Sequence, residues 1–141
     1  MSDINYAKKL FYEGNYTCVL CKENIVYTSL LSGVAPMVEY LNSNTDLKGF
    51  SAADKVVGKA VALLFILAGV KEIYAEVISE SALETLSHSE IRVSYGTVIH
   101  KIMNRFGTDS CPMEQAVELV SVPQIAFEKI KETLGTLKKA V

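Results

Sequence analysis

The second half of the sequence alternates strand-like and helix-like stretches, and this alternation restricts the folds open to the chain. Residues 71–78 alternate polar and apolar side chains and predict a strand, a helix follows to about His88, and residues 91–95 predict the next strand. Consecutive strands separated by a helix pair in parallel, because the chain must cross back over the sheet. We therefore expect an α/β fold with a largely parallel sheet and helices on both of its faces.

The front of the chain predicts an antiparallel hairpin in the same sheet. Residues 16–21 and 25–30 are rich in β-branched and aromatic side chains, and the polar residues 22–24 lie between them. Apolar residues at helical spacing predict a helix on either side of the hairpin, at 4–13 and 34–41. The sheet is therefore predicted to be mixed, with its antiparallel pair at the start of the chain.

Four further helices are predicted, over residues 52–68, 98–105, 112–120 and 123–137. Ser51 is the expected N-cap of the first of these helices, and Gly69 is its expected stop. The sequence has no internal repeat and no linker-like segment. We therefore expect one domain over residues 1–141, a length that suits a single hydrophobic core.

Composition excludes several classes of protein. Half of the residues are apolar and 21% are charged, which excludes a disordered chain. Fourteen Lys and Arg against 16 Asp and Glu leave no basic excess, so we expect no nucleic-acid partner. The longest apolar run, residues 60–70, falls short of the roughly 20 residues that cross a membrane, so we expect no membrane span.

The cysteines and the N-terminus indicate a cytoplasmic protein. The N-terminal residues mix charged and apolar side chains and lack the apolar core of a signal peptide. The three cysteines show no zinc-type spacing. Cys18 and Cys21 are three apart in a predicted strand and should face opposite sides of the sheet, which argues against a redox pair. We expect reduced thiols in the cytoplasm.

The first candidate site surrounds the predicted start of the helix over residues 52–68. Ser51 and Asp54 have the spacing of a capping box, and this structural role is one interpretation of Asp54. Lys55 and Lys59 would share one face of the first two turns, where positive charge is unfavourable. A buried acid or a bound anion would offset that cost; the alternative is that both lysines extend into water. Gly58 inside a helix costs about 1 kcal/mol, so we expect something to pack closely against it.

The second candidate site is the start of the helix at Pro112. Proline at the first helical position makes Cys111 the expected N-cap. A thiol at a helix start experiences the helix dipole and free amides, which would lower its pKa, whereas Glu114 in the same turn would oppose this shift. The alternative is a half-buried, unreactive Cys111 with Ser110 as the cap.

Three runs, over residues 16–21, 47–60 and 111–116, resemble those of an uncharacterised bacterial family, a domain of unknown function with the cytidine-deaminase-like fold. The resemblance covers nearly the whole chain. It implies a three-layer α/β/α sandwich, with a mixed sheet of about five strands that begins with an antiparallel hairpin. This order agrees with the one predicted from the residue patterns.

The resemblance also implies where a site would lie. In zinc deaminases one helix starts with His-Ala-Glu or Cys-x-Glu, a later helix starts with Pro-Cys-x-x-Cys, and both starts meet at the metal. On this pattern Ala52 takes the place of the first ligand and Asp54 that of the proton-transferring carboxylate. Cys111 takes the place of the first cysteine, and Glu114 replaces the second. We therefore expect no complete zinc site, but a pocket between two helix starts that suits an anion.

The main functional hypothesis is a protein that binds a small polar or anionic, nucleotide-like ligand in this pocket, with or without catalysis. Asp54 would act as acid and base, and Cys111 as a thiolate or polar contact. The further ligand contacts would be Ser51, Lys55, Lys59 and Glu114. The sequence assigns no cofactor.

Two other functions stay open. One is a non-catalytic interaction or regulatory module on a degenerate enzyme scaffold, which would self-associate as a homo-oligomer through the edge of the hairpin or a helix face. The other is a divergent metal-dependent deaminase that uses Cys111, Glu114 and Asp54.

Overall fold

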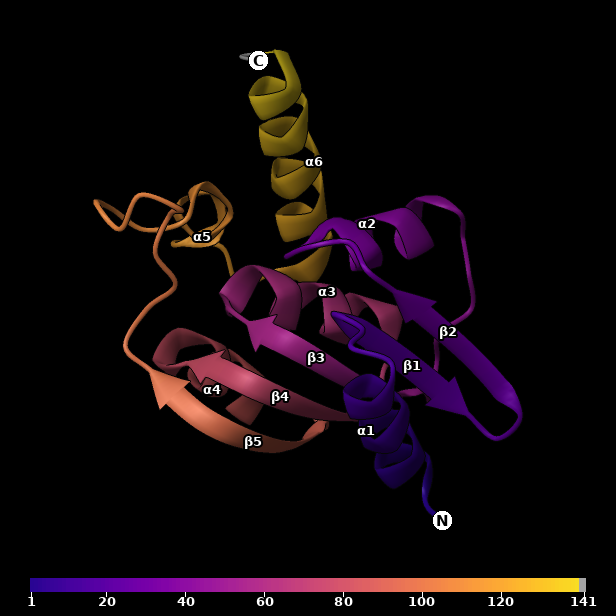
Figure 1. The fold of residues 1–141 in the computed structure, drawn as a ribbon. Helices are drawn as coiled ribbons and strands as arrows, with labels where there is room; N and C mark the ends of the chain where they lie inside the picture. The colour runs from indigo at the N-terminus through magenta and orange to yellow at the C-terminus, as the bar shows by residue number, and fades with distance from the viewer. Residues whose placement is uncertain (140–141) are drawn as a thin grey trace.

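The computed structural model describes residues 1–139 and contains a five-stranded mixed sheet covered by helices (Figure 1). The sheet order is β2-β1-β3-β4-β5. β1 pairs antiparallel with β2 and with β3, whereas β3, β4 and β5 run parallel. The elements are α1 (Asp3–Glu13), β1 (Cys18–Lys22), β2 (Ile25–Ser29), α2 (Ala35–Asn42), β3 (Ser51–Val57), α3 (Lys59–Ala68), β4 (Glu72–Ser79), α4 (Glu80–Ser87), β5 (Arg92–Ile99), α5 (Pro112–Val117) and α6 (Pro123–Lys139).

The α/β class, the mixed sheet and the opening hairpin are confirmed. Lys22 pairs with Ile25 across a two-residue turn. The helices predicted before and after the hairpin are α1 and α2, and the strand predicted at 71–78 is β4. The parallel part of the sheet is smaller than expected, because β1, which lies between β2 and β3, is antiparallel to both of its neighbours.

The helix predicted over residues 52–68 is wrong in its first half. Ser51–Val57 form β3, Gly58 is extended, and the helix starts only at Lys59. β3 lies between β1 and β4 and is covered on both faces, so its apolar residues do not alternate with polar ones. A short apolar run without this alternation cannot be distinguished from a helix by its spacing. The stop at Gly69 is confirmed, with a left-handed φ of 77°.

The helix predicted over residues 98–105 is also wrong. β5 extends to Ile99, and the chain then forms a narrow hairpin over residues 102–111, which we call the finger. The backbone N–H of Cys111 donates to the Ile102 carbonyl at 2.9 Å. At the tip, the Asn104 side-chain oxygen accepts backbone N–H groups from Phe106 and Thr108, both at 3.1 Å. These local bonds from asparagine stabilise a turn in place of a helix.

Two hydrophobic clusters lie on opposite faces of the sheet. The smaller cluster joins α1 to the sheet through Phe11, Val19 and Tyr74. The larger one joins the sheet to the helices on the other face, through side chains such as Phe65 and Ile130. Cys18 lies in the larger cluster and Cys21 in the smaller, which confirms that they face opposite sides.

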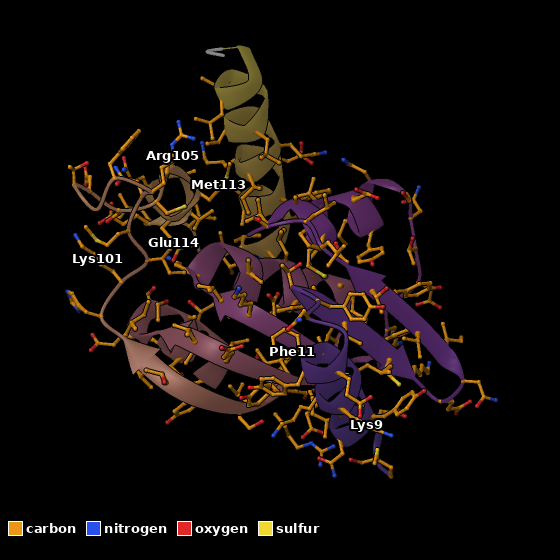
Figure 2. All side chains as sticks on the ribbon, viewed as in Figure 1. Lys9, Phe11, Lys101, Arg105, Met113 and Glu114 are labelled. Carbon is orange, nitrogen blue, oxygen red and sulfur yellow. The ribbon has the colours of Figure 1, made fainter. Side chains whose placement is uncertain are left out.

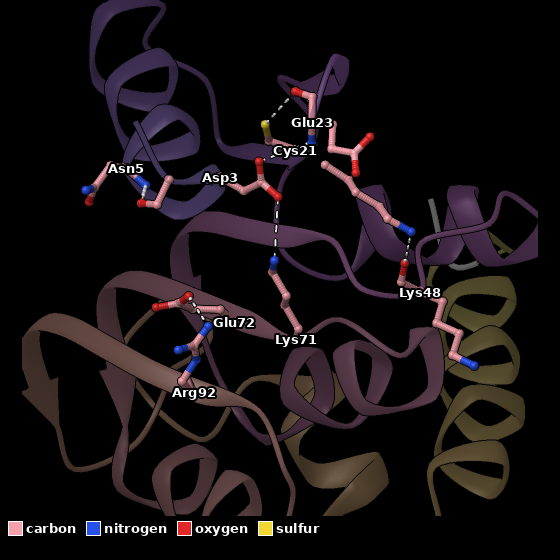
Figure 3. Close-up of polar contacts among 10 residues, drawn as sticks. Asp3, Asn5, Cys21, Glu23, Lys48, Lys71, Glu72 and Arg92 are labelled. Carbon is pink, nitrogen blue, oxygen red and sulfur yellow. Dashed lines mark hydrogen bonds and ion pairs between the residues drawn. The ribbon is translucent and has the colours of Figure 1, made fainter.

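Ion pairs tie the N-terminal ends of the parallel strands to their surroundings (Figure 3). Lys71 Nζ lies 3.6 Å from an Asp3 oxygen of α1. Arg92 of β5 lies 3.2 Å from Glu72 of β4. Within residues 1–139, no helix has the length and apolar character that crossing a membrane requires.

Candidate functional site

The start of α3 is capped by a carboxylate from another helix. The first N–H groups of a helix have no partner within the helix itself. Glu114 of α5 supplies the acceptors: its Oε1 accepts from the Lys59 N–H at 2.8 Å and its Oε2 from the Ala60 N–H at 2.9 Å. Figure 2 places Glu114 beside the start of α3. The helix dipole also favours a negative charge at this position, so one side chain satisfies both requirements.

Lys59 makes a second contact between the two helices, in which α3 supplies a side chain and α5 a backbone group. Its ammonium Nζ donates to the backbone carbonyl of Glu118 at 2.8 Å, at the C-terminal cap of α5. A cation at the end of a helix is favoured by the dipole. The structure thus brings together two predicted site residues, Lys59 and Glu114, and uses them to join α3 to α5.

Gly58 makes the contact with Glu114 sterically feasible. A Cβ at this position would lie 2.5 Å from Glu114 Oε1 and 2.5 Å from Ile102 Cδ1. The backbone of Gly58 is extended, so the requirement for glycine comes from space and not from its φ angle. The expected close neighbour of Gly58 is present, but the premise of that prediction, a glycine inside a helix, is wrong.

Ser51 and Asp54 do not form a capping box, because both lie in β3. Asp54 is 6% exposed and sits between Cys18 and Ala75 on the neighbouring strands. Burial raises the pKa of its carboxyl to about 7, more than the backbone amides of Lys55 and Val56 lower it.

Cys18, which pairs with Asp54 across β1 and β3, is affected by the charge of that carboxylate. Burial raises the pKa of the Cys18 thiol, and the negative charge of Asp54 raises it further.

Ser51 is fully buried, and its hydroxyl has no hydrogen-bond partner among the described residues.

Lys55 and Lys59 do not share a helix face, and this prediction is wrong. Lys55 is an exposed residue of β3, two positions after Ala53, so it faces the same side of the sheet as Ala53 and α1. Lys59 lies at the start of α3 on the other side. The repulsion that would have required a bound anion is therefore absent between these two residues.

Cys111 is the N-cap of α5 and Pro112 is its first residue, as predicted; the alternative with Ser110 as cap is wrong. The thiol makes no capping hydrogen bond, and the side chain packs half-buried against the larger core cluster. α5 has only six residues, and its Glu114 caps α3. The predicted chemical roles of Cys111 and Asp54 stay predictions.

A groove of about 1520 Å³ runs between α3, α4 and α5. Its lining includes Lys59 and Glu114, but not Ser51, Asp54 or Cys111. Its lining combines apolar side chains of α3 with polar residues, among them Glu80, Ser81, His100, Lys101, Ser110 and Gln115.

Sequence reasoning misses most of this polar set. Glu80 directly follows β4 and His100 directly follows β5, and their side chains meet at 3.0 Å. Residues just after the carboxyl ends of parallel strands are the usual ligand contacts of α/β proteins, and this is the signal that the sequence offers. Within the described part of the chain, no three His, Cys, Asp or Glu side chains are placed to hold a metal ion.

Comparisons with known proteins agree on one family. Residues 6–134 match the family TM1506, a domain of unknown function (DUF1893). No curated protein matches the chain. The structure is similar to the crystal structure of a DUF1893 family protein (TM1506) from Thermotoga maritima at 2.70 Å resolution. The TM-score is 0.82 at 28% sequence identity, over 95% of this chain and 89% of the other. The chain therefore belongs to the DUF1893 family, whose function is unknown.

Proposed function

We propose that this chain is a cytoplasmic, non-catalytic interaction module on a cytidine-deaminase-like scaffold. The order β2-β1-β3-β4-β5 supports this scaffold, because it combines an opening antiparallel hairpin with parallel strands. The contact between Glu114 and the start of α3 supports it further, because it brings α5 next to that helix start. In zinc deaminases the starts of two helices likewise meet at the metal.

The observation that carries the proposal is that Glu114 occupies the N–H groups at the start of α3. On this scaffold the helix start corresponds to Gly58, Lys59 and Ala60, and not to Ala52 and Asp54, which lie in the preceding strand. Gly58 and Ala60 offer no side-chain ligand, and the Lys59 ammonium is bound to α5. We therefore infer that a carboxylate of the chain itself takes the place of the metal of a deaminase.

An external anion would have to displace this carboxylate. Hydrogen bonds to a charged group contribute about 1.5–3 kcal/mol each, and Glu114 makes two. Because Glu114 is held by the fold, its effective concentration at the helix start far exceeds that of a free ligand. The wild-type protein should therefore not use this helix start to bind a substrate.

The experiment compares wild-type protein with Glu114→Ala. We expect the wild type to purify without stoichiometric zinc, to release no ammonia from cytidine, adenosine or their nucleotides, and to show no thermal shift with inorganic phosphate. In Glu114→Ala the freed N–H groups should make phosphate stabilising. Glu118→Ala is the matched control, because only the backbone of Glu118 contacts Lys59. Zinc-dependent ammonia release by the wild type would overturn the proposal.

The groove favours a second candidate function, the binding of a small polar ligand at the carboxyl ends of β4 and β5. Its contacts would come from Lys101, His100 and Gln115 instead of Ser51, Asp54, Lys55 and Cys111. A thermal-shift screen of polar metabolites tests this candidate. A shift that is lost in Lys101→Ala and kept in Lys55→Ala would favour it, since Lys55 lies on the opposite side of the sheet.

A further inference from the structure

β5 forms an edge of the sheet, and its outer side is unpaired among residues 1–139. The strand has eight residues, of which Arg92 is the only charged one, and it contains no proline. Tyr95 is 47% exposed, and Val98 is exposed as well. A long edge whose only charge lies at its first residue is a template for pairing with another strand, and monomeric proteins usually protect such edges with charges, proline or bulges.

The opposite edge of the sheet is better protected. β2 has only five residues, and its Thr28 carbonyl accepts a hydrogen bond from the Tyr40 hydroxyl at 3.5 Å. Tyr40 also packs against Tyr27 of β2, with 5.6 Å between the ring centroids. The hairpin edge, which the sequence suggests for self-association, is therefore the weaker candidate of the two edges.

The finger continues the exposed surface beyond β5. Figure 1 shows the chain rising from the end of β5 into the finger along one side of the molecule. Phe106 at the tip is 73% exposed, and the Arg105 guanidinium lies 5.0 Å from the centre of its ring. Met103 is exposed on the same finger. Aromatic residues and arginines are among the side chains that contribute most to the binding energy at protein interfaces.

We propose that β5 pairs antiparallel with β5 of a second copy about a twofold axis, with the two fingers flanking the joined sheets. This inference rests on the proposed function and names its partner. An isologous β5–β5 contact pairs the β5 edges of both copies at once and closes the assembly, leaving only the better-protected β2 edges outside. A β5–β2 contact would leave a β5 edge free on one of the two copies, and further copies could add there to form a filament.

The charges at the ends of β5 favour the antiparallel direction. Arg92 lies at the first residue of the strand, so parallel pairing would place two arginines side by side. Antiparallel pairing separates them and moves each Arg92 toward the far end of the partner strand. Glu80 lies at that end, exposed and bound to His100, and offers an opposite charge. The ion pair between Arg92 and Glu72 is surface-exposed on the arginine side, so the guanidinium is accessible to a partner.

A dimer interface would have to extend beyond the edge of β5. An eight-residue strand is about 26 Å long. Stable interfaces bury about 800 Å² on each partner, which is more than a single strand edge supplies. The exposed apolar side chains on β5 and the finger, Tyr95, Val98, Met103 and Phe106, would supply the additional contact.

Light scattering after size-exclusion chromatography of the full chain tests the association. We expect a particle of twice the 15.5 kDa chain mass at micromolar concentration. Tyr95→Lys would place two ammonium groups near the twofold axis and should weaken the dimer about tenfold or more. Leu119→Lys is the matched control, because Leu119 is 96% exposed on the link between α5 and α6 and should leave the dimer intact. A wild-type monomer would overturn the interface, as would a dimer indifferent to Tyr95→Lys.

Hydrogen exchange locates the interface and separates it from a folding defect. The β5 amides of the wild type should be protected more strongly at high than at low protein concentration, whereas the β2 amides should not change. Protection confined to β2 would overturn the proposal even if a dimer is present. The ammonia-release assay tests the proposed function independently: an inactive monomer rejects only the interface, and an active dimer with zinc rejects only the non-catalytic function.

Discussion

Asp54 and Glu114 are both carboxylates that the sequence marks as site residues, yet the fold gives them opposite surroundings. Glu114 accepts two N–H groups at the start of α3, where the helix dipole also favours its charge. Asp54 lies inside the sheet, where burial raises its pKa to about 7. The N–H groups that bond to Glu114 are those of a helix start, whereas the backbone amides of Lys55 and Val56 do not offset the burial of Asp54.

Removal of the Glu114 carboxylate should have the largest effect on stability. In Glu114→Ala two N–H groups of α3 lose their acceptors, and we expect the free energy of unfolding to fall by about 2–4 kcal/mol. Urea unfolding followed by circular dichroism measures the loss.

Two variants sharpen this test. Glu114→Gln keeps one side-chain oxygen as acceptor and should lose less than Glu114→Ala. Glu118→Ala removes a carboxylate from the same short segment, but the bond from Lys59 goes to the Glu118 backbone and is kept. The free energy of unfolding of this variant should stay within about 0.5 kcal/mol of wild type. Equal losses for Glu114→Ala and Glu118→Ala would contradict the role of the cap.

Neutralisation of Asp54 should have the opposite sign and should depend on pH. The carboxyl pKa is about 7 in the folded protein against 3.8 for an aspartate side chain free in water, so the folded state binds the proton more tightly. The stability of the wild type therefore falls as pH rises from about 4 and levels off above about 7. This pKa difference corresponds to about 4 kcal/mol, so Asp54→Asn should be more stable than wild type by up to that amount at about pH 8.

Urea unfolding of wild type and Asp54→Asn at about pH 5 and pH 8 measures this dependence. Asp109→Asn is the control, because Asp109 is exposed and an asparagine there can still accept the Ser110 N–H. Its difference from wild type should be small at both pH values. A constant difference between Asp54→Asn and wild type across this range would show that Asp54 does not titrate as the structure implies.

A substitution at Gly58 tests the same contact between Glu114 and the start of α3. Gly58→Ala would push a methyl group against Glu114 and Ile102, and we expect a loss of about 1–3 kcal/mol. Gly135→Ala in α6 is the control, since open space surrounds that position and the exchange should stabilise the helix by about 0.5–1 kcal/mol. In a Glu114→Ala background the loss at Gly58 should shrink, because one of the two clashes has gone; a fully additive double variant would argue against the contact.

Sequence patterns predict what is local in this fold and miss what is long-range. α1, the hairpin, β4 and the N-cap at Cys111 follow from spacing and turn residues within a few positions. β3 is mistaken for a helix because a central strand is covered on both faces and loses the alternation that marks strands. The cap on α3 has no local signal at all, since its donor and acceptor lie more than fifty residues apart. The glycine at position 58 indicates a close neighbour, but through the cost of glycine inside a helix, which does not apply to this extended residue.

Two buried serines extend the comparison to uncharged groups and give the smallest expected effects. Ser79 is fully buried, and its hydroxyl accepts the Ala82 N–H at 3.1 Å at the start of α4. Ser51 is equally buried, but its hydroxyl has no partner among the described residues. Ser79→Ala should therefore cost about 1 kcal/mol, whereas Ser51→Ala should be neutral or stabilise by up to about 1 kcal/mol, because it removes a desolvated group without breaking a bond. Thermal unfolding of both variants under one condition measures the difference. If Ser51→Ala lost as much stability as Ser79→Ala, the Ser51 hydroxyl would have a partner, such as a buried water, and the first position of β3 would be a satisfied polar site.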